Sequence, residues 1–280
     1  MCWGWQLLPA NAQSGDSEKK QEQKSQEPPG IQDNSFLVEE AYNQEYGVVQ
    51  HIQIVQRLWQ SKDWAYSFTQ EWPVDRAPRN QLSYTIPVMH GGGSTGTAAT
   101  GMGDIALNYR YQVLGNGKAR VAFAPRLSVL LPTGDSRRGL GSGGAGLQSN
   151  LALSVLSGKR FVTHWNLGGQ WAPAAKDGLG NKAEAWGYNA GQSVVWLLRP
   201  RFNALLETVF FSSESVVAAG KTARDRQMFL NPGIRWAYNF SNGLQIVPGI
   251  SVPVGVGPSA GEAGVLFYLS FEHPFTRRKP

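Results

Sequence analysis

Charged and histidine side chains occur singly along the chain, within stretches whose apolar residues recur at every second position. Nine of them occupy the alternate, polar positions of these stretches: Glu71, Asp104, Arg110, Arg120, Arg126, His164, Glu207, Arg235 and Glu272. Gathered in one enclosed space, such guanidinium and carboxylate groups could orient or select a charged solute. They could instead neutralise one another and fill space, because an unpaired buried charge is costly. The sequence leaves both interpretations open.

Metal and thiol chemistry find no support in the sequence. Cys2 is the only cysteine, so a disulfide within the chain is impossible. The four histidines are too widely spaced for a short metal-ligand motif: His51, His90, His164 and His273. We predict neither a metal site nor a cofactor.

A hydrolase is the main enzymatic alternative, because Ser149 and His164 lie on neighbouring predicted strands. A nucleophile and its base must lie within hydrogen-bonding reach of each other. Successive side chains of a strand point to opposite faces, and the parity places these two residues on opposite faces. The sequence therefore favours a protein without enzymatic activity.

The glycine-rich stretch 132–141 superficially resembles a phosphate-binding loop. It lacks the Gly-Lys-Ser/Thr ending and a following helical stretch that such a loop requires. We interpret it as a flexible external loop, in which Arg137 and Arg138 contact the phosphate groups of lipopolysaccharide.

The elements that position these groups are strands with two chemically different faces. From Asp104 to Val113 the odd positions are apolar or aromatic and most even positions are polar, and Met228 to Phe240 repeats the alternation with Phe229 as the exception. The polar face is rich in Gly, Ala, Ser, Asn and Gln, whereas a face in bulk water is usually rich in Lys and Glu. This composition favours an enclosed interior and an outer face in lipid.

Candidate strands follow at regular intervals: 49–58, 62–73, 80–89, 103–114, 118–131, 147–157, 160–172, 184–198, 200–213, 227–240, 242–254 and 263–275. Their lengths suit a tilted crossing of a membrane. Short connectors, most of them containing Gly (115–117, 158–159, 199–200, 241–243), alternate with long ones (90–102, 132–146, 173–183, 214–226, 255–262). We predict an all-β, closed, antiparallel, up-and-down transmembrane β-barrel of about 12 strands, with ten as the alternative count.

The amino-terminal region differs from the rest of the chain. Residues 1–12 end in an Ala-x-Ala pattern typical of a signal-peptide remnant, and 13–48 form a polar, acidic leader predicted to be disordered. Within it, residues 36–47 carry apolar groups and acids at mixed spacing, which indicates a short helix or a plug. The barrel is predicted over 49–275, and 276–280 form a tail.

Charge separates the same two regions. Residues 1–48 hold eight carboxylates and three lysines, a net −5, so the rest of this +6 chain carries +11. The arginines are spread over many strands and connectors rather than gathered into one stripe, which argues against nucleic acid as a partner. Anionic lipid or an anionic solute fits this distribution better.

Several short motifs resemble a known family. They are Gly103-Asp104-Ile105, Leu131-Pro132-Thr133-Gly134-Asp135, Asn231-Pro232-Gly233-Ile234, Pro248-Gly249-Ile250 and the alternating final segment 264–275, which ends on an aromatic residue. Together, over about residues 80–275, they resemble the outer-membrane family named after the meta-pathway of phenol degradation. The resemblance implies a channel or transporter for small, often aromatic compounds, and a final strand read by the outer-membrane assembly machinery.

We therefore expect a monomeric β-barrel in the outer membrane of a Gram-negative bacterium that passes small solutes, aromatic or anionic ones among them. Its other partners would be outer-membrane lipid, lipopolysaccharide and the assembly machinery. The alternatives are a structural or adhesion barrel that transports nothing, and a secreted β-sandwich that binds carbohydrate.

Overall fold

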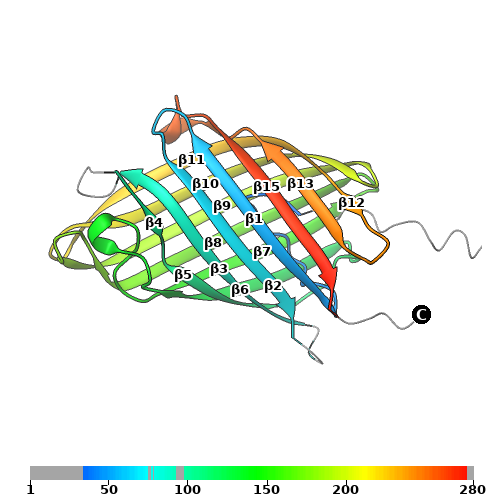
Figure 1. Ribbon diagram of the computed structural model, residues 1–280, viewed down its shortest axis with the longest axis horizontal. Coiled ribbons are helices and arrows are strands. Elements are labelled where there is room, and N and C mark those ends of the chain that lie inside the picture. Colours follow the sequence, from blue (N-terminus) through cyan, green and yellow to red (C-terminus); the bar gives the residue numbers. More distant parts are fainter. Residues whose placement is uncertain (1–33, 75–76, 78, 93–97, 276–280) are drawn as a thin grey trace, which may run out of the picture. The chain divides into compact units, whose positions relative to one another are not determined.

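The computed structural model describes residues 34–74, 77, 79–92 and 98–275, and these form a closed antiparallel β-barrel (Figure 1). The predicted signal-peptide remnant 1–12, most of the acidic leader and the tail 276–280 lie outside the described residues. The strands are β1 Val48–Leu58, β2 Trp64–Pro73, β3 Asn80–Gly92, β4 Ala98–Met102, β5 Ile105–Tyr111, β6 Val121–Leu131, β7 Gly146–Ser157, β8 Phe161–Lys176, β9 Lys182–Arg199, β10 Phe202–Ala218, β11 Lys221–Trp236, β12 Tyr238–Asn239, β13 Gln245–Ser251, β14 Val254–Gly255 and β15 Gly264–Pro274. Among the described residues, no helix is long and apolar enough to cross a membrane.

These segments make twelve crossings of the wall. β4 and β5 both pair with β3 and form one crossing, interrupted at Gly103 and Asp104. In the same way, β11 and β12 form one crossing, and β13 and β14 form another. β1 pairs with β15 from Val48↔Pro274 to Leu58↔Gly264, which closes the sheet on itself. The predicted barrel of 12 strands is therefore confirmed. The secreted β-sandwich is wrong, because a sandwich keeps two separate sheets.

Alternation along each strand produces the two faces that the sequence predicts. On β5 the side chains of Leu107 and Tyr109 are exposed on the outside, while Asn108 and Arg110 are buried inside. β6 repeats the pattern, with Leu127 and Val129 outside and small or polar residues inside. A closed wall satisfies the backbone hydrogen bonds of every strand, so an apolar outer face can lie in lipid.

The two ends of the barrel differ. The end at which β1 begins and β15 ends, here the termini end, has the connectors 158–160 and 200–201. The N–H of Phe275 donates to the carbonyl of Gly47 there at 2.8 Å. The opposite end, here the loop end, carries the long connector 132–145, which contains a 3-10 turn at Ser136–Arg138. An even number of crossings returns the chain to the end from which it started.

Three of the predicted long connectors are wrong. In 90–102, β3 continues to Gly92 and β4 covers Ala98–Met102. Residues 173–183 and 214–226 mostly extend β8, β9, β10 and β11 beyond the loop end, and only 177–181 and 219–220 connect them. Contacts between neighbouring strands stabilise these extensions. Arg224 forms an ion pair with Glu214 at 2.6 Å and lies over the ring of Tyr188, 5.0 Å from its centroid.

Residues 34–47, here called the interior segment, lie inside the barrel and form bends and turns rather than the short helix that the sequence left open. In Figure 1 this part of the chain is the dark-blue trace behind the wall that leads into β1. Eight of its fourteen residues are buried, and Ala41 is fully buried. The side chains of Glu39 and Glu40 form ion pairs with arginines of the wall. Its apolar side chains form much of the small core of the protein, together with wall residues such as Val195, Leu205 and Phe229.

Candidate functional site

The interior segment follows the inner wall around the barrel, and wall side chains hold its backbone. In chain order, it contacts Arg235 on β11, Ser193 on β9, Glu207 on β10, Asn166 on β8, Ser154 on β7, Gln112 after β5 and Gln81 on β3. Most of these bonds are made to backbone N–H or C=O groups. The wall therefore binds the backbone of the segment more than its side chains.

Glu207 makes the densest of these contacts. Its Oε1 atom accepts hydrogen bonds from the backbone N–H groups of Phe36, Leu37 and Val38 at 3.0, 2.8 and 3.0 Å. Its Oε2 atom accepts from Asn231 at 2.7 Å. Glu207 is fully buried, so the carboxylate that the sequence places in the interior binds the protein's own chain.

Phe36 fits into a slot between two glycines of the wall. A Cβ atom at Gly233 or at Gly249 would lie 2.6 Å from the ring of Phe36, which neither position could accommodate without movement. The ring of Tyr268 packs against the same side chain, with 5.2 Å between centroids. The absence of side chains on two neighbouring strands thus creates the space that anchors the segment.

Val38 explains why Phe229 breaks the alternation in its strand. Phe229 points inward and packs with Val38 and Val209, and all three are buried. A lumen-facing aromatic residue would be unfavourable in a water-filled channel, but here it has an apolar partner from the interior segment.

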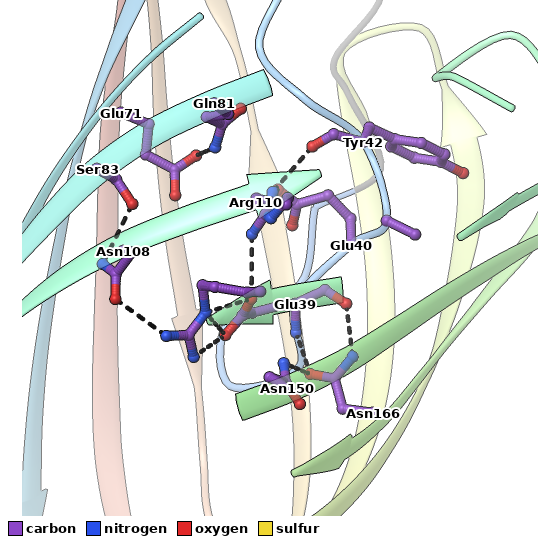
Figure 2. Close-up of polar contacts among 12 residues, drawn as sticks. Glu39, Glu40, Tyr42, Glu71, Gln81, Ser83, Asn108, Arg110, Asn150 and Asn166 are labelled. Carbon is purple, nitrogen blue, oxygen red and sulfur yellow. Dashed lines mark hydrogen bonds and ion pairs between the residues drawn. The ribbon is translucent and has the colours of Figure 1, made fainter. Parts of the chain in front are cut away.

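Glu39 bridges two arginines of the wall (Figure 2). Its Oε1 lies 2.6 Å from Nη2 of Arg126, and its Oε2 lies 3.1 Å from Nη2 of Arg110. The Nε atom of Arg126 donates to both carboxylate oxygens at 3.0 Å. Arg110 also donates to the carbonyl of Tyr42 at 2.9 Å and lies 3.9 Å from the carboxylate of Glu40. The two arginines predicted to line the interior are thus neutralised by the interior segment.

The wall carboxylates Glu71 and Glu272 bond to glutamines. Glu71 accepts from Gln81 at 2.9 Å and Glu272 accepts from Gln50 at 2.9 Å. Both glutamines in turn bond to Gln44 of the interior segment. Arg235 is fully buried, donates to the carbonyl of Asn34, and its guanidinium carbon lies 5.1 Å from the ring centroid of Tyr268.

His164 lies in the interior beside a serine that the sequence did not single out. Its Nδ1 atom is 2.7 Å from the hydroxyl of Ser154, which also accepts a hydrogen bond from the N–H of Ala41. Ser149 is exposed on the outer face while His164 is fully buried, so these two lie on opposite faces, as the parity predicts. The described His, Cys, Asp and Glu residues contain no group of three or more that could hold a metal.

Asp104 holds the connector 132–145 against the barrel mouth. Its carboxylate accepts from the N–H of Gly134 at 2.9 Å and from the N–H and hydroxyl of Ser142, each at 2.7 Å. Leu140 of this connector is buried. The connector predicted to be flexible is therefore tied to the wall at both of its arms.

The predicted external arginines are both exposed, on the 3-10 turn of this connector. Arg138 donates to the carbonyl of Thr100 at 3.0 Å, which joins the connector to β4. Arg137 contributes its backbone N–H to the side chain of Asp135, and its guanidinium remains at the surface.

Arg120, like Asp104 at the barrel mouth, lies away from the interior in which the sequence placed it. β6 begins at Val121, later than the predicted start at 118, and the side chain of Arg120 is exposed at the termini end. Its backbone carbonyl accepts from Leu156 at the end of the neighbouring strand. The prediction counted residues 118–120, which still belong to the turn before β6, into the strand, and so extended the alternation too far.

Two cavities flank these contacts. One of about 280 Å³ lies between the interior segment and β1 to β6, and Glu39, Arg110 and Arg126 line it. The other, of about 700 Å³, lies at the loop end beside the connector 132–145 and the extended parts of β8 to β10. The interior segment thus leaves two separate cavities inside the wall rather than filling the whole interior.

The functional residues that sequence analysis missed are Glu39 and Glu40 of the interior segment. The available signal was the occurrence of acids among the apolar residues of 36–47, in a chain whose predicted strands carry excess positive charge. Which arginines they meet depends on the path of the segment through the barrel, and no local pattern encodes that path.

The sequence matches no family model and no curated protein. Among solved structures, an outer-membrane channel from Pseudomonas putida F1 is similar, with a TM-score of 0.62, 12% identity, and coverage of 83% of this chain and 97% of that one. The NanC porin has a TM-score of 0.50 and 10% identity, with 80% and 98% covered. At these identities the likeness concerns the fold. The chain therefore has the fold of these proteins, a closed β-barrel with an apolar outer face.

Proposed function

We propose that this protein is an outer-membrane channel for small solutes, whose passage is narrowed by the interior segment. The observation that carries the proposal is a closed barrel with a polar, charged inner wall and cavities of about 280 and 700 Å³ in its interior. A barrel that serves only as a scaffold would need neither a charged inner wall nor internal space. The segment is held mostly by hydrogen bonds, which can exchange for bonds to a solute or to water.

Solutes with an aromatic ring fit the cavity at the loop end. Its lining combines apolar residues such as Met89, Leu130 and Val216 with the charged Lys176 and Asp177. This mixture supports the resemblance to the outer-membrane family named after the meta-pathway of phenol degradation, and with it a solute of aromatic character. We retain that family and its association with a degradation pathway as part of the proposal.

The proposed setting follows from the same features. The loop end would face outward, where Arg137 is free to meet lipopolysaccharide phosphates, and the termini end would face the periplasm. The final strand β15, followed by Phe275, suits recognition by the assembly machinery. A single closed barrel encloses the proposed path, so we propose a monomer.

Uptake into proteoliposomes tests the channel directly. The chain and a variant that lacks residues 34–44 would each be reconstituted, and entry of radiolabelled phenol-sized solutes would be compared with protein-free liposomes. We expect uptake above background for the chain and faster uptake for the deletion, because β1 begins only at Val48 and the wall can close without the segment. Background uptake by both, despite correct insertion, would favour a structural or adhesion barrel.

A further inference from the structure

The carboxylate of Glu39 occupies a binding site that belongs to the wall. Arg110 and Arg126 come from the neighbouring strands β5 and β6, and their pairing in register at Arg110↔Arg126 places two guanidinium groups side by side. Glu39 comes from the interior segment, which is not part of the wall. Arg126 holds both of its oxygens through Nε and Nη2, the two-point geometry by which arginine binds any carboxylate.

In the described part of the wall, no carboxylate is hydrogen-bonded to this pair. The wall carboxylate Glu71 is hydrogen-bonded to Gln81 instead. Neutral acceptors complete the surroundings of Arg126, whose Nη1 donates to Asn108 at 3.0 Å and to Gln148 at 3.2 Å. Two adjacent buried cations without an anion would be costly. Glu40 lies 3.9 Å from Arg110, but the carboxylate that binds Arg126 is that of Glu39, so Arg126 loses this anion whenever Glu39 moves away.

Space for an incoming anion adjoins the pair. Both arginines and Glu39 line the cavity of about 280 Å³, together with polar residues such as Thr85, Asn108 and Gln148. A water molecule takes about 30 Å³ of liquid volume, so the cavity has room for a group as large as one ring. In addition, Arg110 is buried, and its Nε has no hydrogen-bond partner in the described part of the chain.

We propose that Arg110 and Arg126 form a binding site for the carboxylate of a permeating small organic acid, which competes with Glu39. This inference rests on the proposed channel function and adds the chemical class of the solute. Glu39 acts as an internal substitute that binds both arginines when no solute is bound. Arrival of the solute exchanges one carboxylate for another, so the barrel never exposes two unpaired cations.

Binding of benzoate, with benzyl alcohol as its neutral counterpart, tests the site in the full-length protein by isothermal titration. Glu39→Gln removes the competing charge but keeps the backbone hydrogen bonds to Asn166 that hold this part of the segment. We expect this variant to bind benzoate about tenfold more tightly or better, because an intramolecular competitor acts at an effective concentration in the millimolar range. Benzyl alcohol binding should not change.

The matched control is Glu214→Gln, which breaks another glutamate–arginine pair, at 2.6 Å, near the loop end. It should leave benzoate affinity at the level of the unmodified chain. A second variant, Glu39→Gln combined with Arg126→Lys, keeps the positive charge but loses the two-point contact, and should lose at least the tenfold gain. Heat-modifiable gel mobility verifies that each variant forms a barrel.

The outcomes separate the site from the channel. If the unmodified chain, Glu39→Gln and Glu214→Gln all bound benzoate with equal affinity, the proposed carboxylate site would be wrong. Uptake of both solutes into proteoliposomes would in that case still support the channel. Tighter benzoate binding by Glu39→Gln that is lost with Arg126→Lys supports the site. If neither solute then entered proteoliposomes, the channel function would be the part that fails.

Discussion

Glu207 and Gly249 carry out opposite tasks at the same place. Glu207 binds three consecutive N–H groups of the interior segment through one oxygen atom, while Gly249 leaves the space that Phe36 fills. Neither residue type would attract attention alone, because an isolated acid or glycine in a strand has many uses. Both acquire their role from a segment that lies more than 150 positions away in the sequence.

Replacement of Glu207 by Gln should release this part of the segment. Hydrogen bonds to a charged acceptor contribute about 1.5–3 kcal/mol each, so weakening three of them should lower the free energy of unfolding by about 1–3 kcal/mol. Hydrogen exchange of the amides of Phe36, Leu37 and Val38 should become faster. Glu71→Gln is the control, since Glu71 bonds to a wall glutamine and not to these amides. Unchanged exchange in Glu207→Gln would contradict the role assigned to this carboxylate.

Gly249→Ala should conflict with Phe36 specifically. The added Cβ would lie 2.6 Å from the ring, and overpacking of this kind costs about 1–3 kcal/mol of unfolding free energy. Urea unfolding in detergent would measure this cost in the unmodified background and in Phe36→Ala, where most of it should disappear. Gly169→Ala serves as the control, because its Cβ would meet only the carbonyl of Gly187, at 3.8 Å. An equal cost in both backgrounds would show that the slot does not hold Phe36.

At the scale of elements, the strands were predictable and the path of the interior segment was not. A period of two is a local property, so β5, β6 and β15 could be recognised from their own residues, and the nine interior candidates followed from parity. The extensions at 173–183 and 214–226 were missed because Gly, Ser and charged residues there resemble a loop, whereas cross-strand pairs such as Arg224 with Glu214 keep them extended. The path of 34–47 depends on contacts with seven different parts of the wall, and these exist only once the barrel has closed.

Two connectors at the loop end are joined by a carboxylate, which makes their contact sensitive to pH. Glu262 accepts from the N–H groups of Trp59, Gln60 and Ser61 at 3.1, 2.9 and 2.9 Å. Partial burial tends to raise the pKa of Glu262, but the N–H groups of Gln60 and Ser61 outweigh it and hold this pKa below its ordinary value. Because the pKa of Glu262 is lower in the folded protein than in the unfolded chain, the ionised carboxylate stabilises the folded protein at any pH above the unfolded-state pKa. This stabilisation is lost as the pH falls through the folded-state pKa.

Acidification should therefore loosen the connector 59–63 before the wall is affected. We expect hydrogen exchange at Gln60 and Ser61, corrected for its intrinsic pH dependence, to lose protection below the ordinary glutamate pKa of about 4.3. In Glu262→Gln, protection should be weaker at neutral pH and nearly independent of pH. Amides of β1 such as Val55, which pair within the wall, provide the internal reference. Protection that is independent of pH in the unmodified chain would contradict the assignment.

For the whole molecule, the central requirement is that the outward-facing side chains of the wall are solvated by lipid. Leu127 on β6 is 53% exposed on the outer face, while Leu179, in the connector 177–181, is 87% exposed beyond the strands. A lysine in the middle of the lipid-facing band costs about 2–4 kcal/mol, and one outside the bilayer costs little. Leu127→Lys should therefore lower the unfolding free energy in lipid vesicles by about that amount, and Leu179→Lys should not change it. Equal effects of the two substitutions would mean that water, not lipid, surrounds the wall, and the channel proposal would fall with it.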